Sequence, residues 1–84
     1  MVSKLQRLRV LRLAENRLDV LRDVERLRPL VALSNASLHS NPLAEVDHYR
    51  AFAVFHLAAL DILDGDSVTD AERLSARSRF ANGA

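Results

Sequence analysis

The sequence predicts an α/β fold: a short right-handed solenoid of about three parallel strands with helical returns, closed by a C-terminal cap helix. Three observations lead to this prediction. Seven positions recur further along the chain at one constant offset, each copy contains one pair of apolar positions two residues apart, and a helix-start motif follows the last copy. The 84 residues are enough for one small domain, so residues 1–84 are treated as a single unit.

The repeat is a series of apolar positions with an asparagine near its end. The members are Val2, Leu5, Leu8, Leu11, Leu13, Asn16 and Leu18 in the first copy, and Leu27, Leu30, Leu33, Ala36, Leu38, Asn41 and Leu43 in the second. The gaps between members are three, three, three, two, three and two residues in both copies. Agreement at seven positions with one offset is hard to obtain by chance, so it indicates an internal structural repeat.

The two-residue step predicts a short strand in each copy. Successive side chains of a strand point to opposite faces, so Leu11 and Leu13 should face inward and Arg12 outward. The asparagines, Asn16 and Asn41, follow where the chain leaves the strand. An amide side chain offers two donors and an acceptor, and can satisfy backbone groups that the turn would leave buried and unpaired. The leucines at three-residue steps then belong to a helical or 3₁₀ return.

A third, looser copy follows, in which Leu57, Leu60 and Leu63 continue the three-residue steps. The segment between Ala36 and its equivalent Leu63 is two residues longer than the earlier spacing, and Gly65 then stands where the earlier copies have a leucine. The regular pattern therefore ends here. We divide the chain into a repeat at 1–26, a repeat with a long helix at 27–56, and a terminal repeat with its cap at 57–84.

Two helices are expected in the second half of the chain. Pro42 stands near the start of the first, and its inner face should carry the residues Val46, Tyr49, Ala53 and Leu57, with His56 beside them as a packing residue with a hydrogen-bonded ring nitrogen. The second should run from Asp70 to about Phe80, because Thr69 and Glu72 have the spacing of a capping box. We expect Leu74 and Phe80 to cover the last coil.

The predicted core contains the inward leucines and one valine of the coils. Its members are Leu11, Leu13, Leu18, Leu21, Val24, Leu27, Leu30, Leu33, Leu38, Leu43, Leu57, Leu60 and Leu63, with Phe52 and Phe80 nearby. A rival interpretation, in which RLDVLRDVERLRPL forms an amphipathic helix or coiled coil, leaves the two-residue steps, both asparagines and the constant offset unexplained.

The ending of the chain resembles that of a known family. The shared elements are Asn41–Pro42, Tyr49–Arg50, Leu63–Asp64–Gly65, Val68–Thr69, Glu72–Arg73 and Phe80. They resemble the ending of the short leucine-rich-repeat proteins that include the regulator of type-1 protein phosphatase, the spliceosomal A-prime protein and many ciliary proteins. The resemblance implies that this ending caps the solenoid. We therefore expect structural roles for Asn16, Asn41, Gly65, Thr69, Glu72 and Phe80.

The family usually has further repeats upstream and its own N-terminal cover. This chain begins with Val2, Leu5 and Leu8, which look like the return segment of a preceding coil. We therefore expect the sequence to be the C-terminal part of a longer array, with its open N-terminal end covered by further repeats or by a partner.

The outward positions of the predicted strands are the candidate binding surface. They are Val10, Arg12 and Ala14 in the first strand, Asn35, Ser37 and His39 in the second, and Ile62, Asp64 and Asp66 in the third. All of them except Ala14 are candidate contacts for a protein partner, because solenoids of this type commonly bind on the concave face that their strands form. The surface should run from basic through neutral to acidic.

Other classes of function find little support in the sequence. The chain has no cysteine, hence no disulfide or thiolate metal site, and no apolar run that approaches the length of a membrane span. His39 and Asp64 are too few ligands for a metal, and no nucleophile accompanies them. The arginines of residues 7–28 scatter over the repeat without interleaved aromatic residues, which argues against direct nucleic-acid binding.

The leading hypothesis is therefore a non-catalytic protein–protein interaction module, without catalytic residues, metal or cofactor. The resemblance favours a scaffold role in a cilium or flagellum, and leaves two alternatives: a regulatory subunit of a type-1 protein phosphatase and a scaffold in a spliceosomal ribonucleoprotein. We expect an intracellular, cytoplasmic protein that does not enter a membrane.

Overall fold

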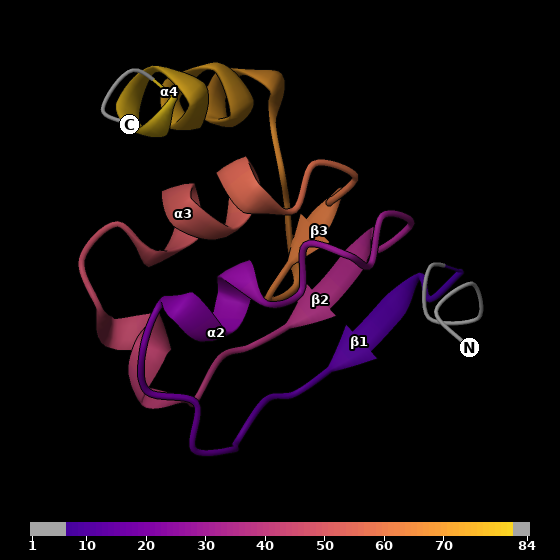
Figure 1. Ribbon diagram of the computed structural model, residues 1–84, viewed down its shortest axis with the longest axis vertical. Coiled ribbons are helices and arrows are strands. Elements are labelled where there is room, and N and C mark those ends of the chain that lie inside the picture. The colour runs from indigo at the N-terminus through magenta and orange to yellow at the C-terminus, as the bar shows by residue number, and fades with distance from the viewer. Residues whose placement is uncertain (1–6, 82–84) are drawn as a thin grey trace.

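The computed structural model describes residues 7–81 of the chain (Figure 1). Four strands and four helical segments follow one another along these residues. In chain order they are β1 (Val10–Arg12), α2 (Arg22–Glu25), β2 (Asn35–Ser37), the 3₁₀ helix η1 (Pro42–Glu45), α3 (Tyr49–His56), β3 (Ile62–Leu63), β4 (Asp66–Ser67) and α4 (Asp70–Phe80). The helices α2 and α3 lie beside each other on one side of the strands, and α4 packs on α3 at the C-terminal end of the stack (Figure 1).

The sheet confirms the repeat that the sequence predicted. Its strand order is β1-β2-β3-β4, and the first three strands are parallel. Leu11 pairs with Ala36, and Ala36 pairs with Leu63, so the equivalent members of the three leucine series are direct partners across the sheet. The strands thus keep the register of the series, including the longer spacing before the third copy. The predicted Val2 and Leu5 positions lie outside the described residues.

The third strand ends earlier than predicted, in a hairpin. Asp66 was expected on this strand, but it lies on β4, which runs antiparallel to β3 and pairs Asp66 with Leu63. The connecting residues Asp64 and Gly65 have φ angles of 54° and 85°. Positive φ at both central residues is the signature of the type I′ turn, whose twist matches that of a hairpin. The Asp-Gly pair therefore reverses the chain after two residues of strand.

The helical returns explain the three-residue steps of the leucines. After the short helix α2, the chain continues in successive turns closed by hydrogen bonds between residues three apart. The N–H of Leu27 donates to Val24, that of Leu30 to Leu27, and that of Leu33 to Leu30, at 2.9, 2.9 and 3.1 Å. This bonding pattern brings every third side chain to the same face. The third coil repeats it with a 3.0 Å bond from Leu60 to Leu57.

The prediction of one long helix after Pro42 is wrong, because η1 and α3 are separate helices with a non-helical segment between them. His48 adopts a left-handed conformation with φ of 66°, and this interrupts helical hydrogen bonding. Val46, expected on the buried face, is 39% exposed. The break changes the direction of the chain, and α3 then packs against both α2 and α4.

The core is continuous, and its residues are more completely buried toward the C-terminal end. The buried members are Val24, Leu33, Ala36, Leu38, Leu43, Tyr49, Ala53, Leu57, Leu60 and Leu63. The predicted core residues of the first coil, Leu11, Leu13, Leu18 and Leu21, are half-buried and pack against this cluster, as do Leu27 and Leu30. A coil of a solenoid is buried by its neighbours on both sides, so the second and third coils bury their leucines most completely.

The last helix caps the stack, but with a different face from the predicted one. Leu74 is 65% exposed, whereas Ala76 is fully buried. Two residues along a helix correspond to a rotation of about 200°, so the two side chains point in nearly opposite directions. Phe80 does lie over the core, with its ring centroid 5.5 Å from that of Phe52 and 5.7 Å from that of Phe55.

Replacing Leu38 by Ala should destabilise the protein strongly. Leu38 is fully buried, and removing its outer carbons leaves a cavity that costs about 2–5 kcal/mol of unfolding free energy. The loss for Leu13→Ala should be smaller because Leu13 is half-buried. Leu74→Ala is the matched control and should change stability by less than about 0.5 kcal/mol. Urea unfolding of the three variants measures the differences; equal losses for Leu38 and Leu74 would contradict the assigned packing.

Candidate functional site: the strand face

The outer side of the parallel strands forms one continuous surface, which we call the strand face. It consists of Val10, Arg12, Asn35, Ser37, His39 and Ile62. Leu11, Ala36 and Leu63, one on each parallel strand, point into the core. The residues next to them along each strand therefore point away from the core. The structure therefore places Val10, Arg12, Asn35, Ser37 and Ile62 on the same side of the sheet, and His39 is exposed just after β2.

The strand register arranges this surface in rows. Val10, Asn35 and Ile62 are partners across the three strands, and Arg12 is the partner of Ser37 in the next row. Neighbouring strands lie about 4.8 Å apart, so side chains of one row are within contact distance of a single ligand side chain. Val10 is 46% exposed and Arg12 is exposed, while the other three are half-buried. Among the described strands, the β1 end of this surface is thus more exposed than its centre.

His39 follows the second strand and remains exposed. Its ring Nδ1 lies 3.3 Å from the hydroxyl of the adjacent Ser40, and its backbone carbonyl accepts a 3.0 Å bond from the N–H of Glu15. The backbone is thereby fixed while the imidazole remains accessible. Glu15 and Ser40 both have positive φ, 61° and 60°, and occupy equivalent positions of successive copies, so the repeat extends to the turn conformation.

Asp64 has a structural role that makes it a poor contact for a partner. One carboxylate oxygen accepts bonds from the N–H groups of Leu38 and His39, at 2.6 and 3.0 Å, and the other accepts a 2.7 Å bond from the Tyr49 hydroxyl. Both oxygens are therefore used within the protein. Asp66 is exposed on β4, beyond the parallel strands. The acidic end that the sequence predicted for this surface is thus reduced to Asp66.

Asn41 links two coils through every polar atom of its side chain. Its Oδ1 accepts bonds from the N–H groups of Asn16 and Leu18, at 3.0 and 3.2 Å. Its Nδ2 donates to the carbonyls of Leu13 and Leu38, both at 2.8 Å. Asn41 is 2% exposed, so these partners replace the water that the backbone groups would otherwise require. This confirms the predicted role of the amide.

The side chain of Asn16 satisfies the backbone of its own coil. Its Nδ2 donates to the carbonyls of Leu13 and Ala14, at 2.9 and 3.2 Å, and the residue is exposed. The repeated asparagines therefore share a place in the repeat but differ in burial.

The cap is held by a capping box and by one arginine. The Thr69 hydroxyl accepts from the N–H of Glu72 at 3.1 Å, and the Glu72 carboxylate accepts from the N–H of Thr69 at 3.0 Å. The Arg50 guanidinium forms a two-point ion pair with Glu72 and also donates to the carbonyls of Leu63 and Ser67, at 3.2 and 3.0 Å. Arg50 thus joins α3, the hairpin and the start of α4.

Residues 1–83 match the family described as leucine-rich repeat. The chain belongs to the leucine-rich-repeat family.

Several curated leucine-rich-repeat proteins are similar in sequence. Mouse centriolin is 42% identical over 59 residues, which cover 70% of this chain and 2% of centriolin. The U2 small nuclear ribonucleoprotein A′ of Schizosaccharomyces pombe is 36% identical over 76 residues, covering 90% and 32%. The dynein axonemal assembly factor 11 of Trypanosoma brucei brucei is 46% identical over 54 residues, covering 64% and 14%. The chain thus spans a third or less of each of these relatives.

Solved structures show the same leucine-rich-repeat fold within complexes. The Drosophila melanogaster SNF/U2A′ complex contains a chain that matches with a TM-score of 0.83 and 29% identity, over 87% of this chain and 42% of that one. The Chaetomium Mex67:Mtr2 subunits give a TM-score of 0.72 and 26% identity, over 94% and 55%. This chain accordingly has the leucine-rich-repeat fold.

Sequence reasoning missed how the repeat ends. Asp64 bonds to the backbone of the preceding coil as Asn41 does to the coil before it, but it comes from a different position of the repeat. The available signal was the Asp64–Gly65 pair, which favours a tight hairpin. In this hairpin the Asp64 side chain lies next to the backbone of Leu38 and His39. Burial of Tyr49 and attachment of the cap by Arg50 agree with the sequence interpretation.

Burial and hydrogen bonding shift the pKa values of Tyr49 and Glu72. Burial raises the pKa of Tyr49, and its hydrogen bond to Asp64 raises it further, so the phenol remains a donor. The hydrogen bond from Arg50, followed by the one from the Thr69 N–H, lowers the pKa of Glu72 to about 2. Glu72 therefore remains ionised well below the usual range of a carboxyl group.

His56 differs from expectation. Its ring Nδ1 is buried without a hydrogen-bond partner among residues 7–81, whereas the sequence interpretation gave it one. Desolvation lowers the pKa of His56, and the nearby Arg28 lowers it further. The ring packs against Phe52 and Phe55, with centroids 4.3 and 4.9 Å away, so the neutral form is favoured and packing is its role.

Two further classes of site find no support in the described part of the chain. Residues 7–81 contain no group of three or more His, Asp and Glu side chains arranged to hold a metal ion. The same residues form no helix long and apolar enough to cross a membrane.

Replacing Asn41 by Ala should cost about 1–3 kcal/mol of unfolding free energy, because buried N–H and carbonyl groups of two coils lose their partners. Asn16→Ala is the matched control. Water can replace its exposed amide, so the loss should be clearly smaller. Chemical unfolding compares them, and an equal loss for both variants would contradict the linking role of Asn41.

Acid should weaken the cap through Glu72. Its pKa is lowered on folding, so its contribution to stability is present above its usual pKa of 4.5 and is lost as the pH falls toward about 2. The Glu72→Gln variant should be less stable than the parent at pH 7, and this difference should shrink at pH 3. Glu45→Gln, at an exposed position of η1, is the control. A constant difference for Glu72→Gln at both pH values would contradict the prediction.

Proposed function

We propose that this leucine-rich-repeat domain binds a protein partner on its strand face and catalyses no reaction. One observation carries the proposal: the strand register aligns exposed Val10 and Arg12 with half-buried polar and apolar side chains on one surface, and the exposed His39 follows β2. The helices α2 and α3 pack on the inner side of the sheet (Figure 1). The outer side is therefore left for a ligand, as in other solenoids.

The chemistry of the strand face favours a partner with an acidic group beside an apolar one. Arg12 supplies a charged, planar donor at the β1 edge, and Val10 and Ile62 supply apolar contacts at the two ends of the next row. Asn35 lies between these two apolar residues and Ser37 lies beside Arg12, and both can donate or accept hydrogen bonds. A protein surface with a carboxylate opposite Arg12 fits this arrangement.

For the biological context, we propose a scaffold component of a cilium or axoneme as the first candidate. The similarity to dynein axonemal assembly factor 11 supports it. The second candidate is a spliceosomal ribonucleoprotein scaffold, supported by the similarity to U2 small nuclear ribonucleoprotein A′ in sequence and to the SNF/U2A′ complex in structure. A regulatory subunit of a type-1 protein phosphatase is a further alternative, supported by the ending of the chain. We also propose an intracellular protein.

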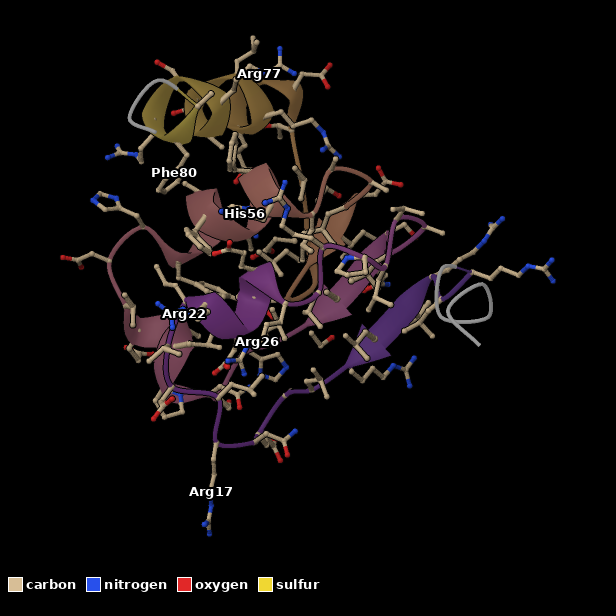
Figure 2. All side chains as sticks on the ribbon, viewed as in Figure 1. Arg17, Arg22, Arg26, His56, Arg77 and Phe80 are labelled. Atoms are coloured by element: carbon tan, nitrogen blue, oxygen red, sulfur yellow. The ribbon has the colours of Figure 1, made fainter. Side chains whose placement is uncertain are left out.

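Reversing the charge of Arg12 should remove the partner while leaving the fold intact. We expect Arg12→Glu to reduce recovery of a specific co-purified protein by about tenfold. The attraction between Arg12 and a carboxylate of the partner in the complex would become a repulsion. Arg22→Glu on α2 makes the same change of charge at an exposed position away from the strand face (Figure 2), and should retain the partner. Quantitative mass spectrometry of both variants tests the proposal; equal recovery with both would refute it.

The cellular context is tested separately by the identity of the recovered protein and by the position of a fluorescent fusion. Axonemal proteins and axonemal signal support the first candidate. Ribonucleoprotein components and nuclear signal support the second, and phosphatase activity in the purified material supports the third.

A further inference from the structure

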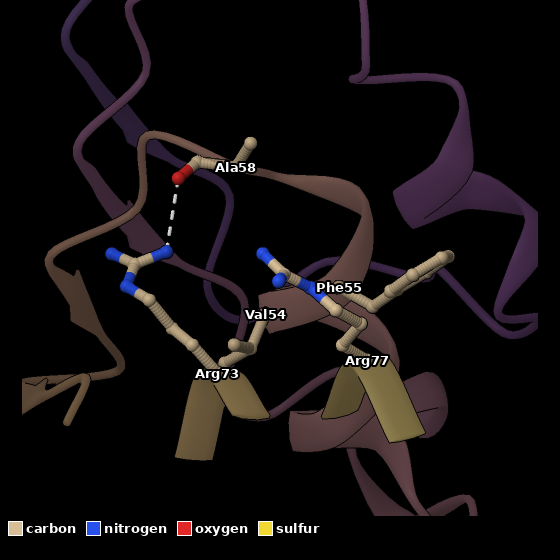
Figure 3. Close-up of a pocket in the computed structure, with 5 residues that line it drawn as sticks. All are labelled: Val54, Phe55, Ala58, Arg73 and Arg77. Atoms are coloured by element: carbon tan, nitrogen blue, oxygen red, sulfur yellow. Dashed lines mark hydrogen bonds between the residues drawn. The ribbon is translucent and has the colours of Figure 1, made fainter. Parts of the chain in front are cut away.

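A second surface, separate from the strand face, lies between the end of α3 and the middle of α4 (Figure 3). It is a cavity of about 340 Å³ lined by Val54, Phe55, Ala58, Arg73 and Arg77. None of these residues belongs to the strand face. The volume is at the low end of ligand sites, which begin at about 300 Å³, so the cavity has room for one or two side chains rather than for a large cofactor.

The first arginine of the cavity is fixed and largely satisfied. Arg73 donates to the carbonyl of Ala58 at 2.9 Å, shown in Figure 3, and also to the carbonyl of Leu60. The Asp61 carboxylate lies 3.7 Å away from the same guanidinium. These partners hold Arg73 as one wall of the cavity and partly neutralise its charge.

The second arginine is available to a ligand. Arg77 lies one turn further along α4, is exposed, and makes no side-chain hydrogen bond or ion pair to any other part of residues 7–81. Figure 3 shows its guanidinium beside the cavity, on the same side as that of Arg73. The lining contains no acidic side chain among the described residues. The cavity therefore offers a positive charge to a ligand.

The floor of the cavity is apolar. Val54 is 3% exposed and Phe55 is half-buried, its ring held against Phe80 and His56. A rigid apolar floor beside an available guanidinium can take an apolar side chain and a carboxylate at the same time.

We propose that this cavity docks an acidic segment of a protein partner, with an aliphatic or aromatic side chain on Val54 and Phe55 and a neighbouring Asp or Glu carboxylate on Arg77. Charge complementarity selects this occupant. A nucleic acid needs several unpaired cations along its backbone, and Arg73 is already engaged by Ala58, Leu60 and Asp61. The proposal is independent of the partner of the strand face.

The test uses the 84-residue chain and fluorescein-labelled synthetic peptides. The first peptide carries a central Glu-Leu-Phe-Glu, the second Gln-Leu-Phe-Gln, and the third Glu-Ala-Ala-Glu, all within the same Gly/Ser flanks. We expect the first to bind at least about tenfold more tightly than either of the others, because each of these lacks one half of the ligand. Backbone NMR signals of Phe55 and Ala58 should shift on binding.

Arg77→Ala should weaken the first peptide by about tenfold, and its circular dichroism should match the parent because the side chain is exposed. The matched control is Arg79→Ala, an exposed arginine of the same helix that does not line the cavity. Its affinity should remain within about twofold of the parent.

Four results would overturn the proposal: no binding of the first peptide at millimolar concentration, equal binding of the three peptides, an unchanged affinity in Arg77→Ala, or NMR shifts confined to other elements. A uridine oligonucleotide that binds the cavity more tightly than the first peptide would also overturn it, in favour of nucleic acid.

Discussion

The structure depends on satisfying backbone groups at the point where each coil leaves the sheet. A solenoid must turn there between buried layers, so several N–H and carbonyl groups lose water without gaining a strand partner. Asn41 solves this problem for the first two coils by bonding to the backbone of both. Asp64 solves it between the second and third coils through Leu38 and His39. Each side chain therefore links its own coil to the preceding one.

This linkage also holds in place the strand face, on which we propose that a partner binds. The side chains of the face alternate with buried ones on strands of two or three residues, which alone would be marginal. The inter-coil hydrogen bonds fix the ends of these strands, and the leucines behind them fix their register. A surface held in this way loses little conformational entropy on binding, so more of the contact energy appears as affinity.

Sequence reasoning succeeded where one spacing rule determines the structure. The offsets between the copies became the strand register, the three-residue leucine steps became turns with three-residue bonds, and Thr69 with Glu72 became the capping box. It failed where two local preferences compete. The apolar pattern after Pro42 favours one helix, but the left-handed His48 interrupts it. Leu74 is a large apolar residue of the kind found in cores, yet it is exposed. Packing of Ala76 and Phe80 on α3 determines which face of α4 is buried.

The two proposed binding surfaces should respond differently to damage, because they depend on different parts of the stack. In a solenoid each coil contacts only its neighbours, so loss of the cap opens the structure from its C-terminal end. The α3–α4 cavity requires α4 to be docked, and Arg50 with Glu72 supports that docking. The exposed edge of the strand face lies on β1 and β2, which are joined by Asn41 and remain paired if α4 detaches. Acid that protonates Glu72 therefore acts first on the cavity, and the β1 edge of the strand face persists until the inter-coil hydrogen bonds are lost.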